Sequence, residues 1–314
     1  MTGFLSDFRN VDSQGLAFTA ALPLVACQRR EVQPGAGEEP VEWFMPEAHA
    51  LDLSDLESTF GGRLGFGLIT PDYRLLSWRS EDRFVYCSTF KAFLAAATLE
   101  RVQNGLEQLD RDIPVTAADM THHAPVTEPA VGGTLTVEAL MKATVELSDN
   151  PAANLLLREM GGLARMQDFY RSLGDTVTRV DRWEPEMNRL DGDKDTTSPR
   201  AAATNLYALL VNRNDGSRPG GPLNDVSLAT LKGWMFDTPT GPGRIKAGLP
   251  AGWTTAHKTG TGGYGPTNDI GVIYAPDGTA LPVAVYYHAD RSSSEADRDA
   301  VIAEATRRAL RAIA

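Results

Sequence analysis

Ser88 and Lys91 stand three residues apart in the segment FVYCSTFKAFLAAATLE, which runs from Phe84 to Glu100. An apolar helical pattern begins directly after the serine, so both residues are expected on one face of the first helical turn. Unpaired N–H groups and the positive end of the helix dipole favour a developing anion there. A serine hydroxyl becomes a nucleophile when a base takes its proton, and this lysine amine can reach it. A capping serine beside a solvated lysine fits the same residues, so S-x-x-K alone does not decide.

Three further polar clusters follow along the chain. Ser148-Asp149-Asn150 precedes a proline and predicts a helix start, with Asn150 as the cap. Lys258-Thr259-Gly260-Thr261 lies in an apolar strand pattern, where a lysine requires an edge or a cleft and a glycine indicates close approach of a backbone or ligand. The segment from Arg179 to Asp195 is rich in acids and predicts a loop of functional size. Each cluster also has an ordinary structural explanation.

Together and in this order, the clusters resemble the class A serine β-lactamases. Ser88-x-x-Lys91, Ser148-Asp149-Asn150, Glu184…Asn188 and Lys258-Thr259-Gly260 match the motif set of that family. The stretches SDNPAANLLLREMGG, DRWEPEMN, DTTSP and HKTGTGGYG resemble it as well, and the resemblance covers roughly residues 48–312. It implies a serine β-lactamase that hydrolyses penicillins and cephalosporins.

The resemblance also implies how the acyl-enzyme would form. Ser88 would attack the β-lactam carbonyl, with Lys91 as the base either directly or through Glu184 and a water. The backbone N–H groups of Ser88 and Thr261 would form the oxyanion hole, which needs fixed donors aimed at developing charge.

Two further pairs of residues are implied for the later proton transfers. Ser148, helped by Lys258, would pass a proton to the departing ring nitrogen. Glu184 and Asn188 would hold and activate the water that hydrolyses the ester.

Substrate binding is implied by charge, because a β-lactam carries a carboxylate that cationic and hydroxyl groups would hold. The implied substrate-binding residues are Asn150, Asn188, Thr259, Gly260, Thr261, Arg244 and His123. Arg244, in GPGRIKAGLP, resembles an arginine that some members supply before the Lys-Thr-Gly strand. Asn150 would bind the substrate's side-chain amide or the catalytic lysine. His123 stands where relatives often place an aromatic residue at the cleft mouth.

Two further expectations come from the resemblance. Arg182 and Asp195 would form the ion pair that closes the loop bearing the glutamate, and the Glu184–Pro185 bond is expected to be cis. Cys87 stands where carbapenem-hydrolysing members carry one half of a disulfide, but Gly262 occupies the partner position. No bridge is therefore expected, and carbapenem hydrolysis does not follow from the resemblance.

Rival functions share the serine and lysine chemistry. A DD-peptidase or penicillin-binding protein would release its acyl group slowly, and a β-lactam sensor would stay acylated; the Glu184 and Asn188 pair argues against both. A related esterase or glutaminase is disfavoured by the full set of motifs. No cofactor is expected, and no metal site either, because His122-His123 lacks neighbours at ligand spacing.

Strands are predicted at both ends of the folded region to position these residues. Leu64, Phe66 and Leu68 alternate with two glycines, as in a strand with one buried face. Short turns between consecutive strands indicate an antiparallel sheet. The expected strands are Arg63–Thr70, Tyr73–Arg79, Thr254–Thr261, Thr267–Ala275 and Leu281–His288.

Helices are predicted between these strands and at the end of the chain. One helix stops at Asn104-Gly105, and Thr136, Ser198 and Ser294 would cap three others. The expected fold is α/β (α+β), a serine β-lactamase/DD-peptidase-like fold. It comprises an antiparallel, roughly five-stranded sheet flanked by N- and C-terminal helices, plus an all-helical subdomain. Residues 48–80 and 221–312 would form the α/β part, and residues 81–220 the helical part with the Glu184 loop.

The composition is that of an ordinary soluble globular protein of 314 residues. A formal net charge of −11 argues against nucleic acid or an anionic membrane as partner. No apolar run is long enough to span a bilayer. A monomer acting on a small-molecule β-lactam is expected.

Residues 1–47 differ from the rest and predict an export leader and linker. Gly15–Ala26 is a short apolar stretch, and Leu24-Val25-Ala26-Cys27 resembles the lipobox of bacterial lipoproteins, in which Cys27 becomes acylated. The preceding residues carry no clear positive excess, so a native N-terminal arm or a miscalled start codon is the alternative. The expected location is the periplasm or cell envelope.

Overall fold

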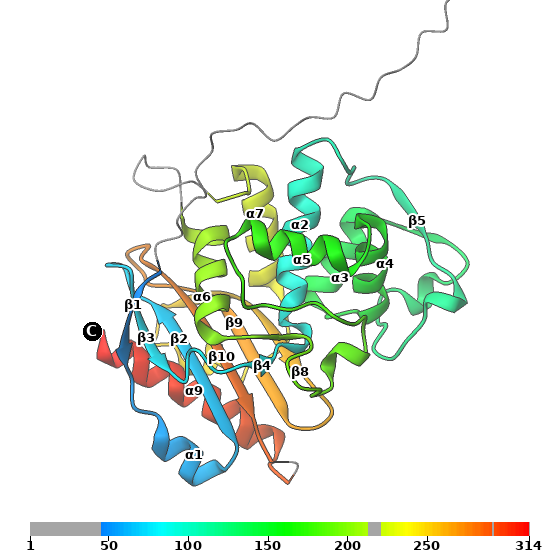
Figure 1. Cartoon of the computed structure of the whole chain (residues 1–314). Coiled ribbons are helices and arrows are strands. Elements are labelled where there is room, and N and C mark those ends of the chain that lie inside the picture. Colours follow the sequence, from blue (N-terminus) through cyan, green and yellow to red (C-terminus); the bar gives the residue numbers. More distant parts are fainter. Residues whose placement is uncertain (1–44, 213–220, 291, 314) are drawn as a thin grey trace, which may run out of the picture. The chain divides into compact units, whose positions relative to one another are not determined.

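A central sheet joins strands from the two ends of the folded region (Figure 1). The computed structural model of the chain describes residues 45–212, 221–290 and 292–313. In spatial order the strands are β1 (Glu47–Ala50), β3 (Arg74–Trp78), β2 (Arg63–Ile69), β10 (Ala280–His288), β9 (Pro266–Tyr274) and β8 (Thr254–Thr261). The five strands from β3 to β8 pair antiparallel, as predicted.

One strand of the sheet was not expected from the sequence. β1 pairs parallel with β3 and gives the sheet a sixth strand. Its residues, EAHA, are mostly exposed and carry no apolar alternation, so only its pairing identifies it as a strand.

Helices make up most of the regular structure outside this sheet in the described residues. They are α1 (Ser54–Phe60), α2 (Phe90–Gln103), α3 (Val137–Glu146), α4 (Asn150–Met160), α5 (Leu163–Ser172), α6 (Pro199–Leu206), α7 (Asp225–Asp237), α8 (Ile245–Gly248) and α9 (Glu295–Ala312). One π-helical turn, Tyr207–Val211, continues α6. Short two-stranded pairs are β4 (Phe84–Val85) with β7 (Thr196–Thr197), and β5 (Asp112–Pro114) with β6 (Thr134–Thr136).

The two faces of β2 show why apolar residues alternate with glycine there. Leu64, Phe66 and Leu68 are buried in one cluster with apolar side chains of α9. On the opposite face, a Cβ added at Gly65 would lie 2.4 Å from the Phe84 ring and 2.8 Å from Pro199. Glycine is therefore required for α6 and the segment before α2 to pack closely on the sheet.

Helix α2 lies inside the helical region and carries the candidate nucleophile segment at its N-terminus. Its residues from Phe90 to Leu99 are all buried, so its apolar side chains contact neighbours all round. Lys91 is the one charged residue in that stretch and is fully buried. A buried cation requires polar partners, which the site supplies.

Helix caps were predicted with one error. Thr136, Ser198 and Ser294 each accept a hydrogen bond from a backbone N–H of the first turn, as expected. At α4 the cap is Asp149, whose side chain accepts from the Ala152 N–H, and not Asn150. Asp149 also accepts from the backbone N–H groups at 126 and 127, and this capping position leaves the Asn150 side chain available for the site.

The expectations for residues 1–47 fall almost wholly outside the described residues, including Gly15–Ala26 and Cys27. Within the described residues, no helix is both long and apolar enough to cross a membrane.

Candidate active site

Ser88 lies in a short 3-10 turn, Cys87–Thr89, that leads from β4 into α2. The residue before it, Cys87, has a positive φ of 49°, a conformation that costs energy for any residue other than glycine and is concentrated at functional sites. The Asn268 side chain holds this segment by donating to the backbone carbonyls of Val85 and Tyr86, at 2.9 and 3.2 Å. The serine is therefore presented by a constrained backbone.

The Lys91 ammonium is surrounded by four polar groups. Its Nζ donates to Ser88 Oγ at 3.1 Å, to the Ser148 carbonyl at 2.7 Å and to Asn150 Oδ1 at 2.5 Å. It also forms an ion pair with Glu184 Oε1 at 3.1 Å, and neither side chain is exposed. Burial lowers the pKa of Lys91, and the neighbouring carboxylate partly opposes this. The lysine is thus placed to exchange a proton with the serine.

A second buried lysine reaches the same cluster from the sheet. Lys258 Nζ donates to Ser148 Oγ at 3.0 Å and to the Thr259 carbonyl at 3.0 Å. Burial lowers the pKa of Lys258 well below its usual value, and the positive charge of Lys91 adds to the shift. Ser148 itself has a positive φ of 61°, which turns its carbonyl toward one lysine while its hydroxyl meets the other.

Glu184 reaches the cluster from the loop between α5 and β7. Its Oε1 lies 3.5 Å from Ser88 Oγ, and its Oε2 accepts a hydrogen bond from Asn188 Nδ2. The Glu184–Pro185 bond is cis, as expected. Asn154 of α4 binds both backbone groups of the glutamate, donating to its carbonyl at 2.8 Å and accepting from its N–H at 3.0 Å. Asn154 was not found in the sequence analysis.

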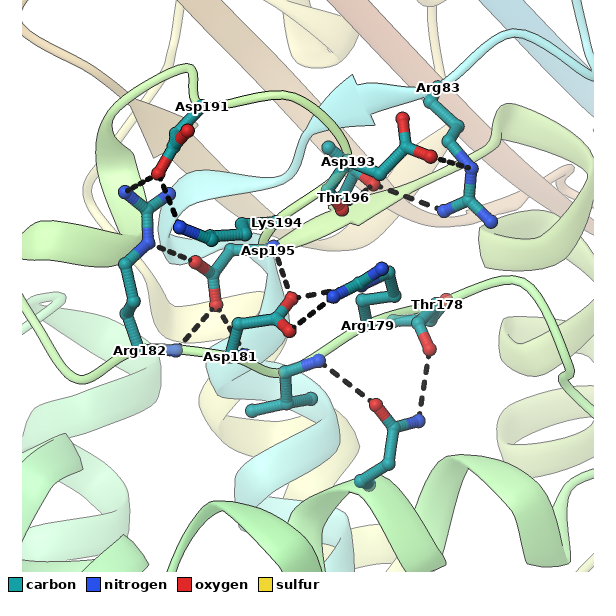
Figure 2. A network of polar contacts seen from close by, with 12 residues as sticks. Arg83, Thr178, Arg179, Asp181, Arg182, Asp191, Asp193, Lys194, Asp195 and Thr196 are labelled. Atoms are coloured by element: carbon teal, nitrogen blue, oxygen red, sulfur yellow. Dashed lines mark hydrogen bonds and ion pairs between the residues drawn. The ribbon is translucent and has the colours of Figure 1, made fainter.

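The base of this loop is held by a network of charged side chains (Figure 2). The predicted ion pair is confirmed, with Arg182 Nε 2.5 Å from Asp195 Oδ2. Asp195 also accepts from the backbone N–H groups of Asp181 and Arg182. Asp181 in turn pairs with Arg179 at 2.6 Å. Because these contacts join the two ends of the loop, they set where its middle lies.

The other end of the site is formed by β8 and the turn before α8. Arg244 is buried and donates to Thr261 Oγ1 at 3.0 Å and to the Asn268 carbonyl at 3.0 Å. Its Nε pairs with Asp299 of α9 at 2.8 Å. A Cβ at Gly260 would lie 2.7 Å from the Tyr86 carbonyl, which confirms the predicted close approach of another backbone.

A cavity of about 470 Å³ opens over these groups. Of the predicted site residues it is lined by Ser88, His123, Ser148, Asn150, Asn188, Arg244, Thr259 and Thr261. Lys91, Glu184 and Lys258 are absent from this lining and are almost fully buried. Lining residues not predicted from the sequence are His122, Thr240, Gly241 and Glu295.

Comparison with known proteins agrees with this geometry. A sequence model described as the Beta-lactamase enzyme family matches residues 50–313. The chain is 37% identical to a β-lactamase of Citrobacter koseri, with 92% of each chain covered. It is 38% identical to β-lactamase SME-1 of Serratia marcescens, covering 85% of this chain and 90% of that protein.

Solved structures agree in fold as well as in sequence. The class A β-lactamase of the last common ancestor of Gram-negative bacteria is 45% identical, with a TM-score of 0.77, and the match covers 83% of this chain and 98% of that one. The chain belongs to the class A β-lactamase family. A β-lactamase of Xanthomonas campestris pv. campestris is 38% identical, with a TM-score of 0.78 and coverage of 83% and 96%.

Two further expectations concern a cysteine and a metal site. Cys87 is a free, buried thiol, and burial raises its pKa well above the usual value. A Cβ at Gly262 would lie 3.2 Å from its sulfur, so the two positions adjoin although only one carries a cysteine. Among the described residues, no group of three or more metal-ligand side chains is close enough to hold a metal ion.

Proposed function

We propose that this enzyme hydrolyses penicillins and cephalosporins through an ester on Ser88. The observation that carries the proposal is the position of the Lys91 amine, 3.1 Å from both the serine oxygen and the Glu184 carboxylate. Ser88 Oγ attacks the β-lactam carbonyl and loses its proton to Lys91, directly or through Glu184 and a water. A lowered lysine pKa supports this role, because a base must be available in its neutral form.

Collapse of the tetrahedral intermediate breaks the ring C–N bond. Ser148 donates its proton to the departing nitrogen and is itself held by Lys258 at 3.0 Å. The backbone N–H groups of Ser88 and Thr261 stabilise the negative oxygen of the intermediate. A Cβ at Gly260 would lie 2.7 Å from the Tyr86 carbonyl and 3.1 Å from the Ser88 backbone N, so the strand that bears Thr261 packs closely on the Ser88 segment, which supports such a fixed pair of donors.

The ester is then hydrolysed by a water held between Glu184 and Asn188. Asn188 Oδ1 is a buried acceptor without a partner among the described residues, while the amide's other end binds the glutamate. A water that donates to this oxygen and to Glu184 would face the ester carbonyl. Glu184 takes the water's proton, the acid product forms, and the serine hydroxyl is restored.

The substrate carboxylate is bound at the Arg244 end of the cavity. Lys258, Thr259, Gly260 and Thr261 belong to one strand there, and charge-assisted hydrogen bonds favour an anion. Asn150 binds the acylamino side chain or keeps Lys91 in place, as its 2.5 Å contact indicates. His123 lies at the mouth, where its ring nitrogen contacts the Leu147 carbonyl at 2.8 Å.

A DD-peptidase would share Ser88, Lys91, Ser148 and Lys258 but hold its ester for much longer. The contact between Asn188 and Glu184 beside the serine favours hydrolysis over that alternative. We further propose that the enzyme acts as a monomer exported to the periplasm or cell envelope.

Replacing the proposed deacylating base tests this mechanism. Glu184→Ala is expected to accumulate one penicillin on Ser88 and to lower kcat by about 10³-fold, because Lys91 can still take the serine proton directly whereas the deacylating water loses its base. Intact-mass spectrometry after mixing with benzylpenicillin measures the adduct. Glu186→Ala, an exposed neighbour in the same loop, is the matched control and should turn over normally.

Three outcomes decide the proposal. Turnover by Glu184→Ala at the parent's rate would show that another group activates the water. Accumulation of the ester by the unmodified enzyme would favour the DD-peptidase alternative. Failure of the unmodified enzyme to react with nitrocefin, benzylpenicillin or a cephalosporin would overturn the function itself.

A further inference from the structure

Glu295 is a cavity residue to which the mechanism above gives no role. It is the first residue of α9 and exposed, and it lines the same cavity as Ser88 and Thr261. An acid in a first helical turn interacts favourably with the helix dipole wherever its side chain points, so the dipole alone does not explain why this acid lines the cavity. Its position in the cavity therefore indicates that its charge faces what the cavity binds.

The position of Glu295 along α9 places it near the arginine of the site. Asp299 follows it by four residues, so the two side chains share one face of the helix. Asp299 pairs with Arg244 Nε at 2.8 Å, and the other side of that guanidinium donates to Thr261 Oγ1. Glu295 thus lies one helical turn from the Arg244 ion pair, at the end of the cavity proposed to hold the substrate carboxylate.

The charges at this end are unevenly matched. Arg244 already has a carboxylate partner in Asp299, whereas Glu295 forms no ion pair with any described residue. A substrate that brought only a carboxylate to this end would meet the negative charge of Glu295 close by. A substrate that carried a cation beside its carboxylate would instead satisfy both Arg244 and Glu295.

Cephalosporins with a cationic ring substituent provide this combination in their own chemistry. Their ring carboxylate stands on the carbon next to the one that bears the variable ring substituent, so that substituent lies beside whatever holds the carboxylate. We propose that Glu295 is a specificity-determining residue that favours β-lactams with a positively charged ring substituent, such as a pyridinium or quaternary ammonium group. The inference rests on the proposed function, because it requires the substrate carboxylate to bind at the Arg244 end.

The test compares two cephalosporins that share one acyl side chain. Cephaloridine carries a pyridinium group where cephalothin carries a neutral acetoxy group, and both carry a thienylacetyl side chain. In Glu295→Gln, the ratio of kcat/KM for cephaloridine to that for cephalothin is expected to fall about fivefold at low ionic strength, mainly through KM. In about 0.5 M salt the change should shrink to less than about twofold, because exposed charges are screened.

A matched control separates the cavity charge from the helix dipole. Glu138 is an exposed acid in the first turn of α3 and does not line the cavity, so Glu138→Gln should leave the ratio unchanged. An unchanged ratio in Glu295→Gln, or an equal fall in both variants, would overturn the inference while hydrolysis by the parent enzyme still stands. If the parent hydrolysed neither cephalosporin nor benzylpenicillin, the proposed function would fail, and the inference with it.

Discussion

Two groups of polar and charged side chains differ in how far their ion pairs are exposed to water. The catalytic cluster consists of Ser88, Lys91, Ser148, Glu184 and Lys258. The loop network consists of Arg179, Asp181, Arg182, Asp191 and Asp195 (Figure 2). Both partners of the Lys91–Glu184 pair are fully buried, whereas the Arg179 and Asp181 side chains are 45% and 24% exposed. Burying a charge pair costs desolvation energy that mutual attraction only partly offsets, whereas exposed pairs contribute little either way.

This difference indicates what each group contributes. The catalytic cluster costs desolvation energy on folding, and it holds a proton donor and a proton acceptor in contact, away from bulk water. The loop network has several overlapping contacts around Asp195, so it holds a shape rather than a proton. Substitutions of residues that connect the loop to the catalytic cluster should therefore change the rate of catalysis. Substitutions of the exposed charges of the loop network should change activity and stability little.

Outside the catalytic residues themselves, the largest expected effect is at Asn154, which connects the loop to the catalytic cluster. Asn154→Leu keeps the size of the side chain but removes both hydrogen bonds to the Glu184 backbone. The carboxylate would lose its fixed position, and deacylation is expected to slow about 10²-fold, since small displacements of a catalytic group have effects of that size. Single-turnover kinetics with benzylpenicillin should show the ester accumulating while acylation stays within a few-fold of the parent.

Gln167 offers a matched control for this substitution. Its amide also binds two backbone groups of the loop, the Thr178 carbonyl and the Val180 N–H, each at 3.0 Å. Gln167→Leu removes the same kind of contact farther along the chain from Glu184, and its deacylation rate should stay near that of the parent. Equal slowing in both variants would mean that loop order in general, and not the position of Glu184, limits the ester's release.

A partly buried histidine with no carboxylate partner among the described residues extends the comparison to pH. His288 at the end of β10 packs edge-on against the Phe84 ring, with centroids 5.1 Å apart. Burial, together with the positive charge of Arg63, lowers the pKa of His288 to about 4. The unfolded chain therefore takes up this proton at a higher pH than the folded chain, so the stability contributed by the neutral ring is present above the usual histidine pKa of about 6.5 and is lost as pH falls below it.

Urea unfolding at two pH values measures this effect. Between about pH 7 and pH 5, protonation at this site should remove about 2 kcal/mol of stability from the parent. Over the same pH interval, the His288→Leu variant should lose about 2 kcal/mol less stability than the parent, whatever its own stability at neutral pH. If the parent and the variant lose equal stability, His288 does not carry the expected proton linkage.

The sequence predicted those parts of the site that depend on local pattern. Ser88 with Lys91, and the strand bearing Lys258, combine a motif with a periodic element, and both were placed correctly. Asn154 was missed because it is one polar residue on α4 whose partner lies 30 residues away, and no local pattern marks such a contact. Glu295 was missed for the same reason, since only the packing of α9 beside the cavity brings it there.

The error of one residue in the cap of α4 has a similar origin. Asp149 and Asn150 are both good capping residues, so propensity does not choose between them. The choice is made by the Thr127 N–H and hydroxyl, which bind Asp149, and by the Lys91 amine, which binds Asn150. All these partners are distant in sequence.

The smallest expected effect is a difference in stability between variants of two arginines in the loop network. Arg182→Ala removes the ion partner of Asp195, whose side chain is fully buried, and should lower the free energy of unfolding by about 2 kcal/mol. Arg179→Ala removes an exposed partner of Asp181 and should lower it by less than about 1 kcal/mol. Thermal unfolding measures both, at about 2–4 °C per kcal/mol for a chain of this size. Equal losses would mean that the backbone N–H groups donating to Asp195 already compensate its charge. Burial of one partner would then not set the strength of these ion pairs.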